Sequence, residues 1–145
     1  MNQIEILKDE HEIIERELIE LDEIIESEDI NYPNLLHVLK NLIKIWDPHE
    51  KREESVFKIL EKENIKIPVE QMFFGHKKLK KHKDAIIKAI EAGSDYKLKK
   101  ALHEHGTVIS KELREHINFE DEILYTIALE EFTPEELVQL CKDVA

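Results

Sequence analysis

Two histidine–glutamate pairs with the same spacing are the clearest chemical signal in this sequence. His49 precedes Glu53 by four residues, and His116 precedes Glu120 by four. On an α-helix this spacing stacks both side chains on one face, one turn apart. An imidazole nitrogen and a carboxylate oxygen can then reach the same metal ion. A single pair would be weak evidence, because both residue types are common on solvated helix faces. Two pairs, each within an apolar helical stripe, indicate a metal site.

Composition favours one amphipathic helical domain over residues 1–145. The chain is long enough to bury a real core. Hydrophobic residues make up 41% and charged residues 37%, with only three Gly and four Pro. This balance is typical of a folded all-helical protein rather than a disordered chain. The net charge of −12 and the absence of a large basic patch argue against nucleic acid as a partner.

The sequence also predicts where the protein resides. A single cysteine, Cys141, excludes an internal disulfide and suits a reducing compartment. No apolar run approaches the ~20 residues of a membrane span. The acidic N-terminal segment does not resemble a signal peptide. We therefore expect a soluble cytoplasmic protein with no membrane partner, while the oligomeric state is left open.

Apolar residues recur at alternating steps of three and four through most of the chain. Gly93 is typical of a helix end, and Thr133 followed by Pro134 of a helix start. Pro48 predicts a kink or a local break within its helix. We expect an all-α fold, an antiparallel up-down four-helix bundle with a short additional C-terminal helix. The expected helices cover approximately residues 2–28, 34–62, 69–92, 95–128 and 134–144.

Each of the four long helices has an inward histidine. His11 and His76 stand where the apolar stripe would call for leucine. Counted from the turns at a rise of ~1.5 Å per residue, these histidines lie at one level along the bundle, within about a turn. Either histidine alone would suit a hydrogen-bonded core residue. Four histidines and two glutamates at one level would be very costly to bury unpaired, which favours a metal site. The predicted ligands are His11, His49, Glu53, His76, His116 and Glu120.

The remaining histidines are expected to have no part in this site. His105 lies in the stripe of its helix but about 16 Å along the axis from His116, so a satisfied core histidine is the expectation. His37, His82 and His103 are expected at the surface.

Two carboxylates shared between ions, with histidines, suit a dinuclear iron or manganese centre. Zinc normally takes four ligands, and six exceed that need.

With these residues in place, the sequence resembles the hemerythrin-like family of HHE cation-binding four-helix bundles, from His11 to Tyr125. The resemblance implies two iron ions, Fe2+ or Fe3+, with a bridging oxo or hydroxo group and two bridging carboxylates; manganese or zinc is less expected. It implies a partner such as dioxygen or another small diatomic ligand, nitric oxide among them. The matching motifs are Glu10-His11, His49-x3-Glu53-Glu54, Met72-x3-His76, and His116-x3-Glu120 followed by Ile123-Leu124.

The resemblance departs from the family pattern in the third helix. The oxygen carriers show two histidines four apart in the third helix, whereas this chain has Lys80 four residues after His76. Lys80 could stand at the position of a lost histidine ligand, or its side chain could reach past the site to solvent. In the second case water, Glu15 or His82 would have to fill the gap. The carriers also place an aspartate five residues after the last histidine, where Asp121 stands. A regular helix points Glu120 inward instead, and only a local bulge would re-aim Asp121.

Three functions from different classes follow. The leading expectation is a non-enzymatic di-iron protein that binds or senses dioxygen or nitric oxide. The alternative is a di-iron enzyme that oxidises ferrous iron or reduces peroxide or nitric oxide, including a role in iron handling or repair. The third is a metal-free interaction bundle. For the first two, a dry aromatic pocket beside an open iron position is expected, lined by Trp46, Phe57, Phe73 and Phe119.

Overall fold

The computed structural model describes residues 1–144, and these residues form helices and turns with no strand. Three long helices come first, followed by a continuous helical run from residue 95 to residue 131 that contains two π-helical turns, η1 and η2. A short helix ends the described chain. The elements are α1 (Gln3–Glu26), α2 (Tyr32–Glu61), α3 (Val69–Ala92), α4 (Asp95–Ala101), η1 (Leu102–Gly106), α5 (Thr107–Phe119), η2 (Glu120–Leu124), α6 (Tyr125–Glu131) and α7 (Pro134–Leu140).

Side-chain caps and one left-handed glycine set the helix ends. The side chains of Asn2 and Asn31 each accept a hydrogen bond from a first-turn backbone N–H, at 3.0 Å. Gly93, with φ 62°, ends α3 in the left-handed conformation that glycine adopts most easily. Thr133 and Glu136 form a reciprocal capping box at the start of α7. The expected start of the last helix is confirmed.

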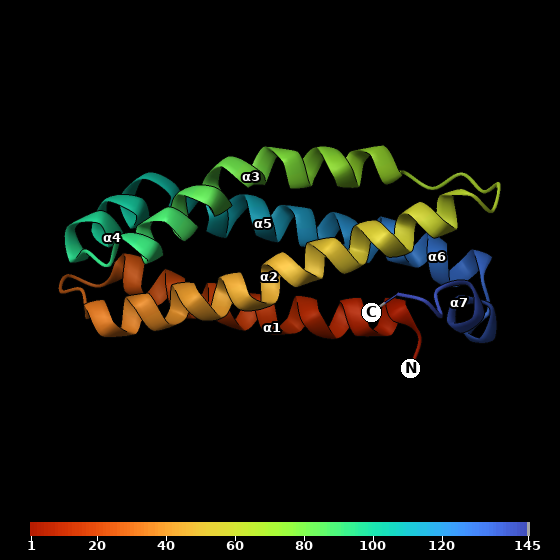
Figure 1. Ribbon diagram of the computed structural model, residues 1–145, viewed down its shortest axis with the longest axis horizontal. Coiled ribbons are helices and arrows are strands. Elements are labelled where there is room, and N and C mark those ends of the chain that lie inside the picture. Colours follow the sequence, from red (N-terminus) through yellow and green to blue (C-terminus); the bar gives the residue numbers. More distant parts are fainter. Residues whose placement is uncertain (145) are drawn as a thin grey trace.

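The long helices pack side by side as a helical bundle (Figure 1). α1 contacts α2, α2 contacts α3, and both α1 and α3 contact α5. α7 packs against α1, and Leu137 joins the apolar residues at the N-terminal end of α1. The expectation of an all-helical bundle is confirmed. No helix among residues 1–144 combines the length and the apolar character needed to cross a bilayer.

The apolar core consists of two clusters, and a polar layer separates them. One cluster contains Ile14 and Trp46, and the other contains Leu7 and Val56. His11 therefore lies between the two clusters along α1, and Glu53 lies between them along α2. The same change of cluster occurs on α3 around His76. The bundle thus holds the six predicted ligand side chains in one layer with apolar packing on both sides.

The two π-turns change which residues of the last long helical run face the core. A π-turn holds one more residue than an α-helical turn, so the residues after it rotate relative to a regular helix. Gly106 is buried where His105 was expected. A regular helix predicts Ile123 and Ile127 on the inward face, but Ile123 is 46% exposed and Ile127 is only partly buried. Leu124 and Ala128 are buried in their place.

Two smaller expectations also need correction. α2 continues through Pro48, so the local break does not occur. The apolar residues of the last helix predict that Leu137 and Val138 both pack on the bundle. Leu137 is fully buried, but Val138 is 51% exposed.

Candidate metal centre

All six predicted ligand side chains meet in the polar layer. α1 contributes His11, α2 contributes His49 and Glu53, and α3 contributes His76. The last helical run contributes a histidine at the end of α5 and a carboxylate at the start of η2. Glu53 and Glu120 are 0% and 1% exposed. The six residues brought together are His11, His49, Glu53, His76, His116 and Glu120.

Their donor atoms form two groups of four that share both carboxylates. In the first group, His11 and His49 join Glu53 and Glu120. In the second, His76 joins the same two carboxylates, together with the histidine of α5. Within each group the donor atoms lie within 4.8 Å of one another. Each carboxylate therefore faces both groups, which is the arrangement of a bridging ligand.

Individual distances show how each carboxylate spans the two groups. Glu53 Oε1 lies 2.8 Å from His76 Nε2, and Glu53 Oε2 lies 3.5 Å from His49 Nε2. Glu120 Oε1 lies 3.0 Å from His11 Nε2, and Glu120 Oε2 lies 2.8 Å from His116 Nε2. Each carboxylate thus directs one oxygen to each group. In all four of these histidines, Nε2 is the nitrogen that faces the centre.

The opposite nitrogen of three histidines faces a carboxylate. His11 Nδ1 lies 2.8 Å from Asp121 Oδ1, and His49 Nδ1 lies 3.0 Å from Glu10 Oε1. His76 Nδ1 lies 3.3 Å from an oxygen of Glu54. A carboxylate at Nδ1 holds the proton there, orients the ring and leaves the Nε2 lone pair free for a metal.

Asp121 is re-aimed as a local bulge would require, because η2 begins at Glu120. Its carboxylate nevertheless meets Nδ1 of His11, on the side of the ring away from the centre. Asp121 is absent from both donor groups, whereas Glu120 belongs to both. Asp121 therefore lies beside His11 on the outer side of the ring, and Glu120 lies within the cluster of potential donor atoms.

His116 depends on a close approach by α3. Its Nδ1 and Cε1 atoms lie so near Gly75 that a Cβ there would come within 3.0 Å of the ring. Real Cβ atoms essentially never approach a neighbour that closely. Because Gly75 has only a hydrogen atom in place of a side chain, the His116 ring has room to reach the centre. No pattern in the sequence predicts this role, because the glycine simply interrupts an otherwise helical pattern.

Tyr125 is the buried polar residue at the centre that sequence reasoning missed. Its hydroxyl donates a hydrogen bond to Glu53 Oε2 and lies 3.2 Å from His11 Nε2. Its ring stacks on His11 and on Phe57, with centroids 5.1 Å and 5.8 Å apart. On a regular helix the stripe runs through Ile123 and Ile127, and only η2 turns Tyr125 inward.

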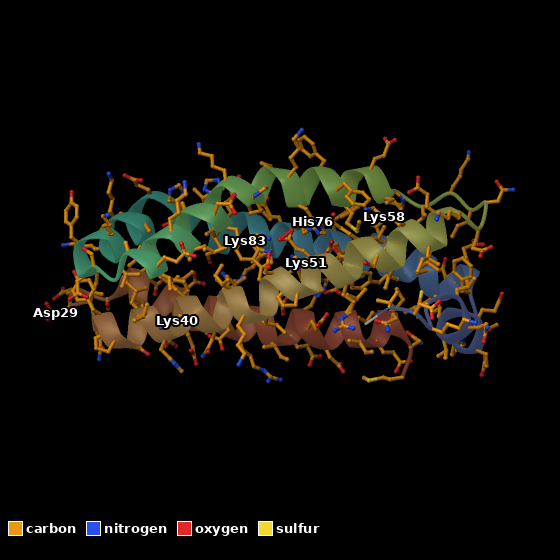
Figure 2. The ribbon with its side chains drawn as sticks, in the orientation of Figure 1. Asp29, Lys40, Lys51, Lys58, His76 and Lys83 are labelled. Atoms are coloured by element: carbon orange, nitrogen blue, oxygen red, sulfur yellow. The ribbon has the colours of Figure 1, made fainter. Side chains whose placement is uncertain are left out.

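A carboxylate of α2, held by a buried lysine of α3, lies beside His76. Lys83 is buried and donates hydrogen bonds to Glu50 and to Asp47, the latter at 3.1 Å. Glu50 Oε2 lies 3.6 Å from His76 Nδ1. Figure 2 shows His76 and Lys83 both pointing from α3 toward α2. The presence of Lys83 in the apolar sector, which core packing alone does not explain, is thus explained by buried partners on α2.

Buried donor atoms without hydrogen-bond partners are a separate reason why this set of side chains fits a metal. His49 Nε2, His116 Nε2 and Glu120 Oε2 are buried and make no hydrogen bond. The last two lie 2.8 Å apart, but they do not meet in hydrogen-bond geometry. Buried polar atoms normally have partners, since an unsatisfied one costs ~1–3 kcal/mol. One metal ion in each donor group would satisfy all three atoms, because His49 belongs to the first group, His116 to the second and Glu120 to both.

The charges at the centre alter the pKa values of both carboxylates. Burial would raise the pKa of Glu53, but hydrogen bonds with Glu120, His49 and His76 lower it well below its usual value. Burial and the negative charge of Glu53 raise the pKa of Glu120 well above its usual value. Two acids share one dry site, and one of them retains its proton.

The histidines divide in the same way. Burial would lower the pKa of His49, but hydrogen bonds to Glu10 and Glu53 raise it to about 9. Burial and the nearby charge of His76 lower the pKa of His116 to about 4. Without metal at pH 7, His49 therefore carries a positive charge and His116 is neutral.

We expect metal binding to release protons. His49, with its pKa of about 9, holds a proton at pH 7 that a metal must displace, and the raised pKa of Glu120 acts in the same direction. The apparent affinity for Fe2+ should therefore rise as the pH increases from 7 toward 9. Anaerobic calorimetry in buffers of different ionisation enthalpy counts the protons released. Affinity that does not change over this pH range, with no proton release, would contradict the expectation. His37→Ala, an exposed change, is the control.

Several alternative ligands lie outside both donor groups. Glu15 and His82 belong to neither group. Lys80 is exposed, with 67% of its side chain accessible, and its Nζ lies 2.7 Å from Asp84 Oδ2 on the next turn. His105 is only partly buried, which corrects the expectation of a core histidine. His82 is also partly buried rather than fully at the surface.

Lys80→His is expected to leave metal binding unchanged. The side chain points to solvent and pairs with Asp84, so a histidine in that rotamer would not face the centre. Equilibrium iron binding and the optical spectrum should match those of the unmodified protein. Lys77→His, at another exposed position of α3, is the matched control. Tighter iron binding in Lys80→His alone would mean that this position can supply a ligand.

The four aromatic residues expected around one pocket are separated in the structure. Phe119 lines a pocket of about 190 Å³ between α3 and α5, beside His116. Phe73 lines another of about 520 Å³ between α2 and α3 that includes His76. Phe57 and Trp46 are buried in the two apolar clusters. The expected single aromatic pocket is therefore wrong, and the two pockets reach the centre from opposite faces of α3.

Comparison with known proteins gives one match. The family model described as the hemerythrin HHE cation-binding domain matches residues 2–128. No curated protein and no solved structure matches the chain. The matched segment contains all six donor residues, in a helical bundle whose histidine–glutamate cluster has the composition of a metal-binding site. The chain therefore belongs to the hemerythrin HHE cation-binding domain family.

Proposed function

We propose that this protein is a non-haem di-iron protein that binds or senses dioxygen, or a related diatomic ligand such as nitric oxide. The observation that carries the proposal is that Glu53 and Glu120 each belong to both groups of donor atoms. Two carboxylates that each direct one oxygen to each of two sites are suited to hold a pair of ions close together. A mononuclear site would not need this sharing.

The proposal assigns two histidines to each ion. His11 and His49 would hold the first ion, and His76 and His116 the second, with both carboxylates shared. Imidazole and carboxylate donors suit iron, and such sites keep open coordination positions. Zinc would normally be closed by four donors of its own. Two iron ions would supply one-electron redox chemistry and open positions at which a diatomic ligand can bind.

The fold that we propose for this function is one domain over residues 1–145, an antiparallel up-down four-helix bundle. Residues 95–131 would serve as the fourth helix, because α4, η1, α5, η2 and α6 follow one another without a loop. α7 would then be the additional short helix. In this arrangement each of the four helices supplies at least one ligand at the same level.

The residues around the ligands have defined tasks. Glu10, Glu54 and Asp121 hold the histidine rings with Nε2 toward the centre. Tyr125 donates a hydrogen bond to Glu53 and so fixes that carboxylate between the two donor groups. The apolar clusters above and below the layer exclude water. The pocket beside His116 offers a small ligand a way in from the surface.

The test is iron loading followed by exposure to dioxygen. Protein loaded with Fe2+ without air should develop charge-transfer absorption when air is admitted, and the change should reverse when dioxygen is removed. His37→Ala serves as an exposed control and should behave like the unmodified protein. Protein that retains no iron, or stays colourless with iron bound, would overturn the proposal.

A specific observation also favours the enzymatic alternative. Because Lys80 points to solvent, α3 supplies one histidine to the centre, and each ion would have four protein ligands, two of them shared carboxylates. An under-coordinated iron is more reactive, which suits oxidation of ferrous iron or reduction of peroxide or nitric oxide. Turnover assays with these three substrates decide between the two functions. A stable, reversible adduct without turnover supports binding, and multiple turnovers support the enzyme.

A further inference from the structure

A second pair of histidines meets away from the dinuclear layer. His82 of α3 and His105 of η1 lie with their Nδ1 atoms 2.9 Å apart. Their ring centroids are 5.1 Å apart, and the ring planes are inclined by 61°. Eleven residues separate His105 from His116, which corresponds to about 16 Å along the helix. Both side chains are partly exposed, so the pair is within reach of solvent ions.

The π-turn η1 is what brings His105 to this position. A regular helix would place His105 in the apolar stripe, but Gly106 is buried there instead. A Cβ at Gly106 would lie only 3.1 Å from Leu102 Cδ1 and 3.4 Å from Ile25 Cδ1, so the backbone is tightly packed at this point. His105 is thereby turned toward α3. π-turns occur frequently at functional sites, and the other π-turn of this chain begins at Glu120.

The separation of the two nitrogens matches a metal site of a particular geometry. Metal–imidazole bonds are about 2.0–2.1 Å long. Two such bonds at a right angle place their nitrogens about 2.9 Å apart, whereas a tetrahedral angle requires about 3.3 Å. The observed 2.9 Å therefore suits two neighbouring positions of a square-planar or tetragonal ion. Cu2+ and Ni2+ prefer that geometry with nitrogen and oxygen donors.

The surroundings leave the inward nitrogens suitable as ligands. Glu104 Oε2 lies 3.7 Å from His105 Nε2, on the far side of the ring from His82. A carboxylate there favours the proton on Nε2 and leaves the Nδ1 lone pair free. Burial and the neighbouring His105 lower the pKa of His82, which keeps its imidazole neutral at pH 7. Glu112 and Lys81, which also act on His82, have opposite charges and act in opposite directions.

We propose that His82 and His105 form a second metal site, for a divalent ion of the copper and nickel class, outside the dinuclear layer. The two Nδ1 atoms occupy neighbouring coordination positions. Each ring then carries its proton on Nε2, and Glu104 lies beside that nitrogen of His105. The remaining positions of the ion are filled by water or by a small exogenous ligand. This site does not share a residue with the dinuclear groups.

The test is titration of the protein with Cu2+, followed by equilibrium binding and electron paramagnetic resonance. The unmodified protein should bind one equivalent more than His82→Ala or His105→Ala, with hyperfine coupling to two nitrogens in that equivalent. Each single variant should weaken binding of this equivalent at least tenfold, and the double variant should be no weaker than either single one. His103→Ala, at an exposed position of the same π-turn, is the control and should retain the equivalent.

Equal stoichiometry and spectrum in the unmodified protein and both single variants would overturn the proposal. Fully additive losses, in which the free-energy loss of the double variant equals the sum of the two single losses, would also overturn it, because they indicate two independent histidines. His82→Gln and His105→Gln replace the alanine variants if circular dichroism shows that those do not fold. The copper difference is measured on iron-free protein, so it holds whether or not the dinuclear centre takes up iron.

Discussion

Glu53→Ala is expected to lose bound iron almost completely, the largest effect of any single ligand change. Glu53 is fully buried, and its two oxygens face His76 and His49, which belong to different donor groups. Its loss removes a donor from both ions and also the negative charge that offsets their mutual repulsion. Even residues that only orient a ligand are worth about 10–100-fold in metal affinity, so the loss here should exceed that range.

His11→Ala is the matched comparison, because His11 belongs to one donor group only. It should retain a measurable fraction of the iron, with the second group still occupied. Metal analysis of both variants after the same anaerobic loading and desalting gives the two ratios. Circular dichroism of the metal-free proteins separates loss of binding from loss of folding. Equal iron-to-protein ratios in the two variants would contradict the bridging role of Glu53.

Gly75→Ala is expected to weaken iron binding at least tenfold without any change to a ligand. The new Cβ would collide with the His116 ring, which packs directly against the glycine. Either the ring or α3 must move, and a displacement of a few tenths of an ångström or more breaks the geometry of the second group. Equilibrium binding of Fe2+ measures the effect.

A double-mutant cycle shows whether the effect acts through His116. Gly75→Ala combined with His116→Ala should bind iron no more weakly than His116→Ala alone, because the clash disappears with the ring. Gly106→Ala is the control, since it crowds Leu102 in the apolar core and not the centre. Full additivity of Gly75→Ala and His116→Ala would mean that the glycine acts by another route.

The level of the six side chains was predictable because helices have a fixed rise and the turns between them are short. His11 and His76 interrupt apolar stripes, and both side chains lie in the layer where counting from the turns placed them. α3 begins and ends at the expected residues, because Gly93 ends it clearly. The helix rise and the residues that end a helix are properties of the local sequence, so they can be predicted without knowledge of tertiary contacts.

The π-turns could not be predicted, because tertiary packing decides them. The hydrophobic pattern of residues 95–131 agrees with a regular helix, and nothing local marks the extra residue in each turn. For that reason Tyr125 and the orienting contact of Asp121 were missed, and His105 was placed in the core. Lys80 and Lys83 likewise both fall in the apolar sector of α3, and the sequence does not distinguish them. Only the position of Asp47 and Glu50 across the bundle distinguishes the buried Lys83 from the exposed Lys80.

The most direct test of the central claim is the iron content of the protein together with the magnetic state of its ferric form. The account predicts two iron ions per chain after anaerobic loading, desalting and oxidation. It also predicts that the two ferric ions are antiferromagnetically coupled through their shared ligands, and therefore silent in electron paramagnetic resonance. One iron per chain with the signal of an isolated high-spin ferric ion would contradict the account.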